Sequence, residues 1–148
     1  MADLVTTLTE TVTLNASLRG SSNSVTTTGI NDVFERIVTC TASVVTTVAV
    51  FDTLPSTSPG AIDVDRSKYI RLTNLETEAI IELAVQTTTS SYTVTLTPGN
   101  SHILCQGSAV ALGQVGAPSF GTMLDIASLQ VKPTTAVTAR VEIFVGLE

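Results

Sequence analysis

Short runs in which every second residue is apolar recur along the chain. The clearest ones lie in the centre of the sequence, separated by polar turns: Tyr69–Thr73, Ala79–Val85, Tyr92–Leu96 and Ser101–Leu104. A period of two places successive side chains on opposite faces of a strand, so that one face of each run can meet a core. These four runs predict an antiparallel meander.

The same alternation extends to both ends of the chain. Leu4–Leu14 places leucine and valine on one side and threonine on the other, and Val137–Val145 alternates apolar with mostly polar residues. With Ser43–Phe51 and several shorter runs, the pattern predicts eight to ten strands and at most one short helical turn. We therefore expect a single all-β domain over residues 1–148, an antiparallel β-sandwich or jelly roll.

Three segments leave their structure open. In Gly29–Ile37, Asn31 or Asp32 could cap a short helical turn, but the segment reads equally well as a strand entered through a turn at Gly29. Leu18–Thr28, which is rich in Ser and Thr, fits an edge strand or a loop, and it follows a predicted turn at Asn15-Ala16-Ser17. Near the C-terminus, Ala109–Leu112 fits a short strand, and Gly113–Gly121 fits a surface loop.

Charge and composition exclude two classes of partner. The net charge is -6, and the seven basic residues are scattered singly, which disfavours phosphate binding and hence nucleic acid. The longest mostly apolar stretch, Val44–Phe51, is too short to span a bilayer, so no membrane insertion is expected. The first ten residues lack the basic and apolar regions of a signal peptide, which predicts synthesis in the cytoplasm without secretion.

Few residues offer chemistry. His102 is the single histidine, and a structural or surface role is favoured over a catalytic one. Asp63 and Asp65 would share one side of an extended strand and could bind calcium, but Arg66 and Lys68 follow them and favour ion pairing. Without a secretion signal, Cys40 and Cys105 are expected to be free thiols rather than a disulfide. The sequence therefore predicts no enzyme, no cofactor and no metal site.

Four segments carry a resemblance to a known group of proteins: GINDVFERIV (Gly29–Val38), SKYIRLTNLETEAIIEL (Ser67–Leu83), LTPGNSHIL (Leu96–Leu104) and ARVEIFVG (Ala139–Gly146). They resemble small β-rich proteins encoded by tailed phages of marine and aquatic bacteria. The similarity spans nearly the whole chain and lies in strands and turns rather than in a site.

The resemblance implies a structural protein of the virion. The leading hypothesis is a head decoration protein that binds the assembled capsid, through the major capsid protein, as a homo-oligomer and preferably a trimer. A tail, neck or fibre component is the alternative, and a carbohydrate-binding module for host attachment ranks third. The two terminal strands supply the predicted interface residues, unless both strands only complete the core of the protomer: Leu4, Leu8, Val12, Val141, Ile143 and Phe144.

Overall fold

The computed structural model describes residues 1–53, 60–105, 124–134 and 136–148, and confirms the predicted all-β class. The described residues form strands and no helix. The strands are, in chain order, β1 (Ala2–Thr9), β2 (Val12–Leu14), β3 (Ser17–Arg19), β4 (Ser22–Ile30), β5 (Asp32–Cys40), β6 (Thr46–Asp52), β7 (Ile62–Asp63), β8 (Ser67–Asn74), β9 (Ile81–Gln86), β10 (Ser91–Leu96), β11 (Ser101–Cys105), β12 (Ser128–Pro133) and β13 (Ala139–Leu147).

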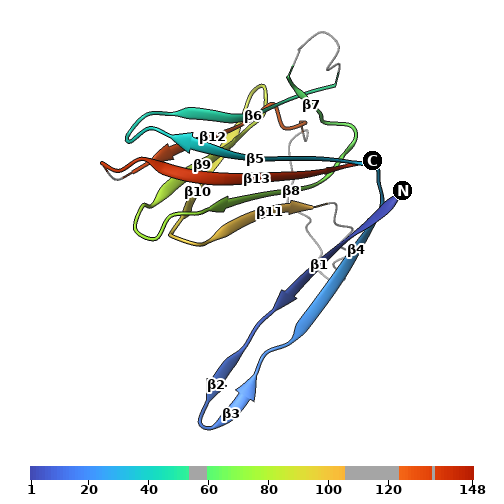
Figure 1. Ribbon diagram of the computed structural model, residues 1–148, viewed down its shortest axis with the longest axis vertical. Helices are drawn as coiled ribbons and strands as arrows, with labels where there is room; N and C mark the ends of the chain where they lie inside the picture. Colours follow the sequence, from blue (N-terminus) through green and yellow to red (C-terminus); the bar gives the residue numbers. More distant parts are fainter. Residues whose placement is uncertain (54–59, 106–123, 135) are drawn as a thin grey trace, which may run out of the picture.

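Two sheets form the body of the molecule (Figure 1). One sheet has four strands in the order β11-β8-β13-β5, and the other has five in the order β10-β9-β12-β6-β7. All pairings within them are antiparallel except that of β6 with β7. The strands β1 to β4 lie outside both sheets and form a long arm that projects from one end of the body (Figure 1).

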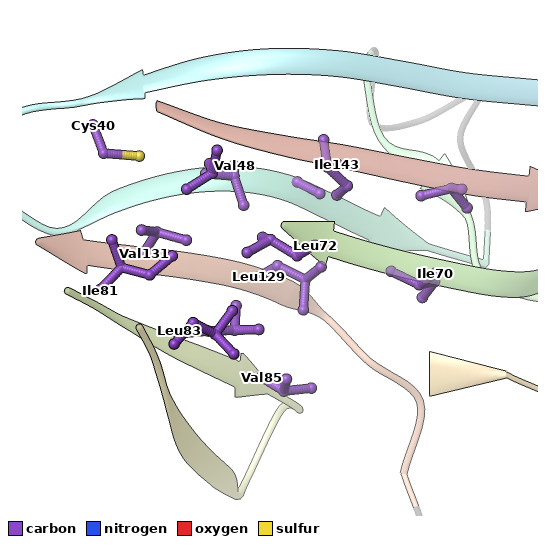
Figure 2. Close-up of a cluster of buried hydrophobic side chains, with 14 of the residues drawn as sticks. Cys40, Val48, Ile70, Leu72, Ile81, Leu83, Val85, Leu129, Val131 and Ile143 are labelled. Atoms are coloured by element: carbon purple, nitrogen blue, oxygen red, sulfur yellow. The ribbon is translucent and has the colours of Figure 1, made fainter. Parts of the chain in front are cut away.

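The core lies between the two sheets. Alternate residues of β9 and β13, such as Leu83 and Ile143, point inward and are almost wholly excluded from solvent. Figure 2 shows side chains of β8, including Leu72, lying with those of β12, including Leu129 and Val131. Burying such β-branched and aliphatic side chains contributes about 1.5–3 kcal/mol each. This packing is the consequence of the period-two pattern in the sequence.

The predicted central meander is wrong in its connections. The strands β9 and β10 do pair as a hairpin, but β8 pairs with β11 and β13 in the opposite sheet. The segment between β8 and β9 therefore crosses from one sheet to the other. Alternation states which side of a strand is buried and does not state which strand lies beside it.

Asn74, at the end of β8, holds this crossing in place. Its side chain is fully buried, and its amide nitrogen donates hydrogen bonds to the carbonyl oxygens of Ala79 (2.8 Å) and Leu96 (3.2 Å). Its side-chain oxygen accepts a hydrogen bond from the Glu76 backbone N–H at 3.1 Å. Asn74 thus joins the crossing segment to the end of β10. Both polar atoms of its side chain have hydrogen-bond partners, as is usual for a buried amide.

Glu76 fastens the same crossing segment to β13 and predicts an acid sensitivity. Its Oε1 accepts hydrogen bonds from the backbone N–H and from Nε of Arg140, both at 3.0 Å, and these contacts hold the pKa of the Glu76 carboxyl below its ordinary value of 4.5. Because the folded protein holds the proton less tightly, the stabilisation is complete above about pH 4.5 and is lost as the pH falls through the lower folded value.

We expect Glu76→Gln to lower the urea midpoint of unfolding at pH 7, and the difference from the native chain to shrink as the pH falls below about 4.5. Equilibrium unfolding in urea at stepped pH values measures this. Glu78→Gln is the control, because Glu78 is exposed and makes no ion pair with any residue that the structure describes. A constant difference between native chain and Glu76→Gln at every pH would contradict the assignment.

The open segment Gly29–Ile37 resolves as a strand. After Ile30 the chain turns at Asn31, whose backbone N–H donates to the Leu147 carbonyl at 2.9 Å, and β5 begins at Asp32. The helical-turn alternative is therefore wrong. Pairing of β5 with all nine residues of β13 satisfies its backbone on one side, which a single helical turn could not do.

Candidate interaction surface

The arm is one continuous β-hairpin. The pairing Thr9↔Ser22 of β1 with β4 continues in the same register as Val12↔Arg19 of β2 with β3. The interruption between them lies at Gly20, where a Cβ would sit 2.0 Å from the Glu10 carbonyl oxygen, so that only glycine fits. The predicted turn at Asn15-Ala16-Ser17 is confirmed, and φ values of 51° and 61° at Asn15 and Ala16 are typical of a two-residue type I′ turn.

The two sides of the arm differ in chemistry. Residues paired directly across an antiparallel ribbon share a side, so Leu4, Leu8 and Val25 lie on one side, which we call the apolar side. The opposite side carries hydroxyl groups: Thr7 bonds Ser24 at 2.8 Å, and Thr9 bonds Ser22 at 3.0 Å. Four hydroxyl groups of the hydroxyl side therefore bond one another in two pairs within the hairpin, whereas the large apolar side chains of the apolar side stay exposed.

Large apolar side chains of the arm are exposed to solvent. The following residues each expose between 58% and 73% of their surface: Val5, Leu8, Val12, Leu14, Leu18 and Val25. An isolated two-stranded hairpin is at best marginally stable in water, and a soluble monomer seldom exposes such a concentration of apolar residues. The arm has the composition of a surface that becomes covered when it binds a partner.

At its root, the arm is packed on its own body. The outward side of the four-stranded sheet, which we call the outer face, includes Tyr69 and Gly146. Leu4 and Ile30 lie over Gly146, within 3.4–3.5 Å of where its Cβ would be, and both Ile30 and Tyr69 are buried. They form a small apolar cluster separate from the main core, so the apolar side of the arm already packs on the outer face at this point.

The close packing at Gly146 predicts a size limit. Alanine fits there at ordinary contact distances, but the branched side chain of Gly146→Leu would displace Leu4 and Ile30. We expect Gly146→Leu to cost about 1–3 kcal/mol of folding free energy. It should also speed hydrogen exchange at the Asn31 amide, whose bond to the Leu147 carbonyl anchors the root. Gly146→Ala is the matched control, and equal behaviour of the two variants would show that the root is not packed as described.

The six predicted interface residues occupy different environments. Leu8 and Val12 lie exposed on the arm, Leu4 is half-buried at its root, and Phe144 is half-buried on the outer face. Val141 and Ile143 are fully buried in the core, where their side chains cannot contact another subunit. The prediction that these two residues belong to an interface is therefore wrong. The reason is that β13 lies between β8 and β5 and is a central strand, not an edge.

The outer face carries further exposed apolar residues that the sequence pattern alone did not single out. Val33 and Ile37 of β5 expose 47% and 60%, and they flank Glu35 on the same side of this edge strand. In the middle of the face Arg71 pairs with Glu142 and lies 5.9 Å from the Phe144 ring centre. Identifying this surface requires knowing which side of β5 the core covers.

His102 occurs in a structural contact. Its Nε2 lies 3.1 Å from the Tyr92 hydroxyl, with the two rings edge to face at 5.9 Å, and this contact joins β11 to β10 across the two sheets. Burial raises the pKa of the Tyr92 phenol. No acidic side chain of the described residues bonds this pair.

The other candidate residues likewise have structural partners or lie apart. Asp63 accepts a hydrogen bond from the Asp65 backbone N–H at 3.1 Å, which caps the turn after β7. Within the described ranges, no group of three or more His, Cys, Asp or Glu side chains gathers as metal ligands would.

Cys40 and Cys105 are both free thiols. They lie on the two edge strands of the four-stranded sheet, Cys40 beside Ala139 at the start of β13 and Cys105 beside Tyr69 near the start of β8, which lies at the opposite end of the sheet. The segments Ala109–Leu112 and Gly113–Gly121 lie outside the described residues.

No family model, no curated protein and no solved structure matches this chain. Nor does the described part of the chain contain a helix with the length and hydropathy needed to cross a bilayer.

Proposed function

We propose that this protein is a structural component of a phage virion, and specifically a head decoration protein that binds the assembled capsid as a homo-oligomer, preferably a trimer. The observation that carries the proposal is the projecting hairpin arm with its uncovered apolar side. An arm of this kind has a use only where a neighbouring molecule covers it. The sequence resemblance to small virion proteins of tailed phages points in the same direction.

The strand order supports the jelly-roll form of the predicted sandwich. Counting β5 as the first strand of the body and leaving out the two-residue β7, the four-stranded sheet holds strands one, eight, three and six, and the other sheet holds two, seven, four and five. This order arises from two Greek keys wound together, an arrangement that recurs in viral capsid domains. Because one fold hosts many functions, the arm carries the proposal and the sandwich supports it.

The mechanism is binding rather than catalysis. The body is a sandwich of two sheets with a continuous core, and the outer face belongs to one of these sheets. A protein that binds the assembled capsid, and not the free capsid subunits, stabilises the assembled state by mass action. The contacts that matter are then the apolar ones that form when a neighbouring molecule covers the arm, and no covalent bond is made or broken.

Heads that lack this protein provide the test. We expect the purified chain to co-sediment with such heads up to a fixed ratio and to raise the temperature at which they open. Deleting residues 1–29 should abolish both effects while the sandwich body remains folded by circular dichroism, because the main core contains no residue of this segment and the hydrogen bond from Asn31 to Leu147 stays. Heads that neither bind the intact chain nor gain stability would overturn the proposal.

A tail, neck or fibre location remains the alternative proposal, with the same arm binding a different virion partner. Carbohydrate binding has weaker support, because Tyr92 is the one aromatic residue among the exposed large apolar side chains of the described chain, and its hydroxyl is engaged by His102. A sugar platform ordinarily needs more than one open aromatic face.

A further inference from the structure

We infer that the partner which covers the arm is a second copy of this chain, and that the apolar side of the arm packs on the outer face of that copy around Val33 and Ile37. The inference rests on the proposed homo-oligomer and deepens it by naming the two surfaces that meet. It is drawn from the chemistry and geometry of the protomer.

The root of the arm provides the first argument. There, Leu4 of the apolar side already packs over Gly146 of the outer face, in the same protomer. Beyond the edge of the body, the same side continues with Leu8, Val12 and Val25, all exposed. The surface that suits Leu4 is therefore the kind of surface that suits the residues after it, and a neighbouring copy offers it again.

The outer face provides the second argument. On β5 it presents Val33 and Ile37 to solvent, next to the half-buried Phe144 on β13. The chain's own arm lies against another part of this face, at Tyr69, Arg71, Phe144 and Gly146, and leaves Val33 and Ile37 exposed. The protomer thus has one apolar surface that projects and one that receives, and neither is covered by the protomer itself.

Charge gives the third argument. Arg19 is the one Lys or Arg residue in the arm, and it lies directly across from Val12, on the same side of the hairpin. Glu35 lies on the outer face between Val33 and Ile37. Within the described residues neither takes part in an ion pair of its own protomer. An arm seated over Val33 and Ile37 brings these two opposite charges together.

The buried area suits a ring in which each copy gives its arm to one neighbour and receives the arm of another. Leu8, Val12, Leu14 and Val25 leave on the order of 400 Å² of apolar surface uncovered, about half of the roughly 800 Å² that each partner buries in a stable interface. A copy that gives its arm to one neighbour and receives the arm of another takes part in two such contacts, so its total buried area approaches roughly 800 Å². Head-to-tail contacts form a closed ring where the rotation between copies closes, and a trimer is one such ring.

Disulfide trapping between two full-length chains tests the contact. One chain carries Leu8→Cys and the other Ile37→Cys, both with Cys105→Ser so that the exposed native thiol is absent; Cys40 is buried and stays. Docking raises the effective thiol concentration to about the millimolar range, so we expect at least about tenfold more heterodisulfide than between Thr7→Cys and Ile37→Cys. Thr7 is the matched control, because it neighbours Leu8 on the hydroxyl side.

Charge reversal tests the register independently. Light scattering on the native chain should give the mass of a multimer, Arg19→Glu or Glu35→Arg alone should shift it toward the monomer, and the double variant should restore it. A monomeric native chain, equal trapping in the Thr7→Cys control, or no rescue by the double variant would each overturn the inference. A monomer that still binds heads would overturn this inference and the homo-oligomer, and would leave the head decoration role standing. A multimer formed through the arm that binds no heads would overturn the head decoration role and leave this inference standing.

Discussion

Replacing Asn74 with leucine is expected to lower the free energy of unfolding by about 3–5 kcal/mol, since it leaves buried carbonyl groups without donors at a cost of about 1–3 kcal/mol each. The carbonyls of Ala79 and Leu96 lose their bonds from Asn74, and the Glu76 N–H loses its acceptor. For a chain of this length, that corresponds to a fall in melting temperature on the order of 10 °C. Thermal unfolding followed by circular dichroism measures it.

Asn100→Ala is the matched control for Asn74. Asn100 lies in the turn that packs beside Asn74, but its side chain is exposed and bonds only to the Thr97 hydroxyl. We expect a change within about 1 kcal/mol. If Asn74→Leu were as mild as Asn100→Ala, the crossing between β8 and β9 would not depend on the Asn74 amide.

The second large effect separates the core role of β13 from an interface role. Ile143 has no exposed surface, and replacing a buried isoleucine with alanine costs about 2–5 kcal/mol because a cavity remains. Ile37, on the neighbouring strand, is 60% exposed. We expect Ile37→Ala to change the stability of the protomer by no more than about 0.5 kcal/mol, and to weaken self-association instead.

Urea unfolding and light scattering on the same two variants complete the comparison. The place of Ile143 in the core and the proposed contact at Ile37 predict opposite outcomes: Ile143→Ala loses stability, and Ile37→Ala lowers the mass of the multimer. An Ile143→Ala chain of native stability that no longer associates would restore the original assignment of this residue to an interface, and would contradict its place in the core.

The sequence predicted the fold class because alternation is a local property. Runs such as Ile81–Gln86 show which side of the strand is buried, and the turn at Asn15-Ala16 begins with an asparagine, which tolerates positive φ. The partner of each strand is not local. Nothing in the residues between Asn74 and Ile81 distinguishes a hairpin from a crossing between sheets, so β8 and β9 were expected to pair and do not.

Only part of the candidate surface was predictable, because alternation is local and does not show where a strand lies in the fold. The alternation in Leu4–Leu14 identifies an apolar side, but a sequence pattern does not say whether that side meets the protomer's own core or projects from it. Only the three-dimensional arrangement separates Leu8, which projects, from Ile143, which is buried, although both belong to alternating runs near the ends of the chain. Val33 and Ile37 were missed because the core covers the other side of β5.

The number of copies in purified particles tests the central claim most directly. Quantitative mass spectrometry of intact virions, referenced to the major capsid protein, measures it. A head decoration protein predicts a fixed, capsid-scale ratio that falls together with head stability when the gene is removed. Particles without this chain, or with only a handful of copies that leave the head unaffected when lost, would contradict it.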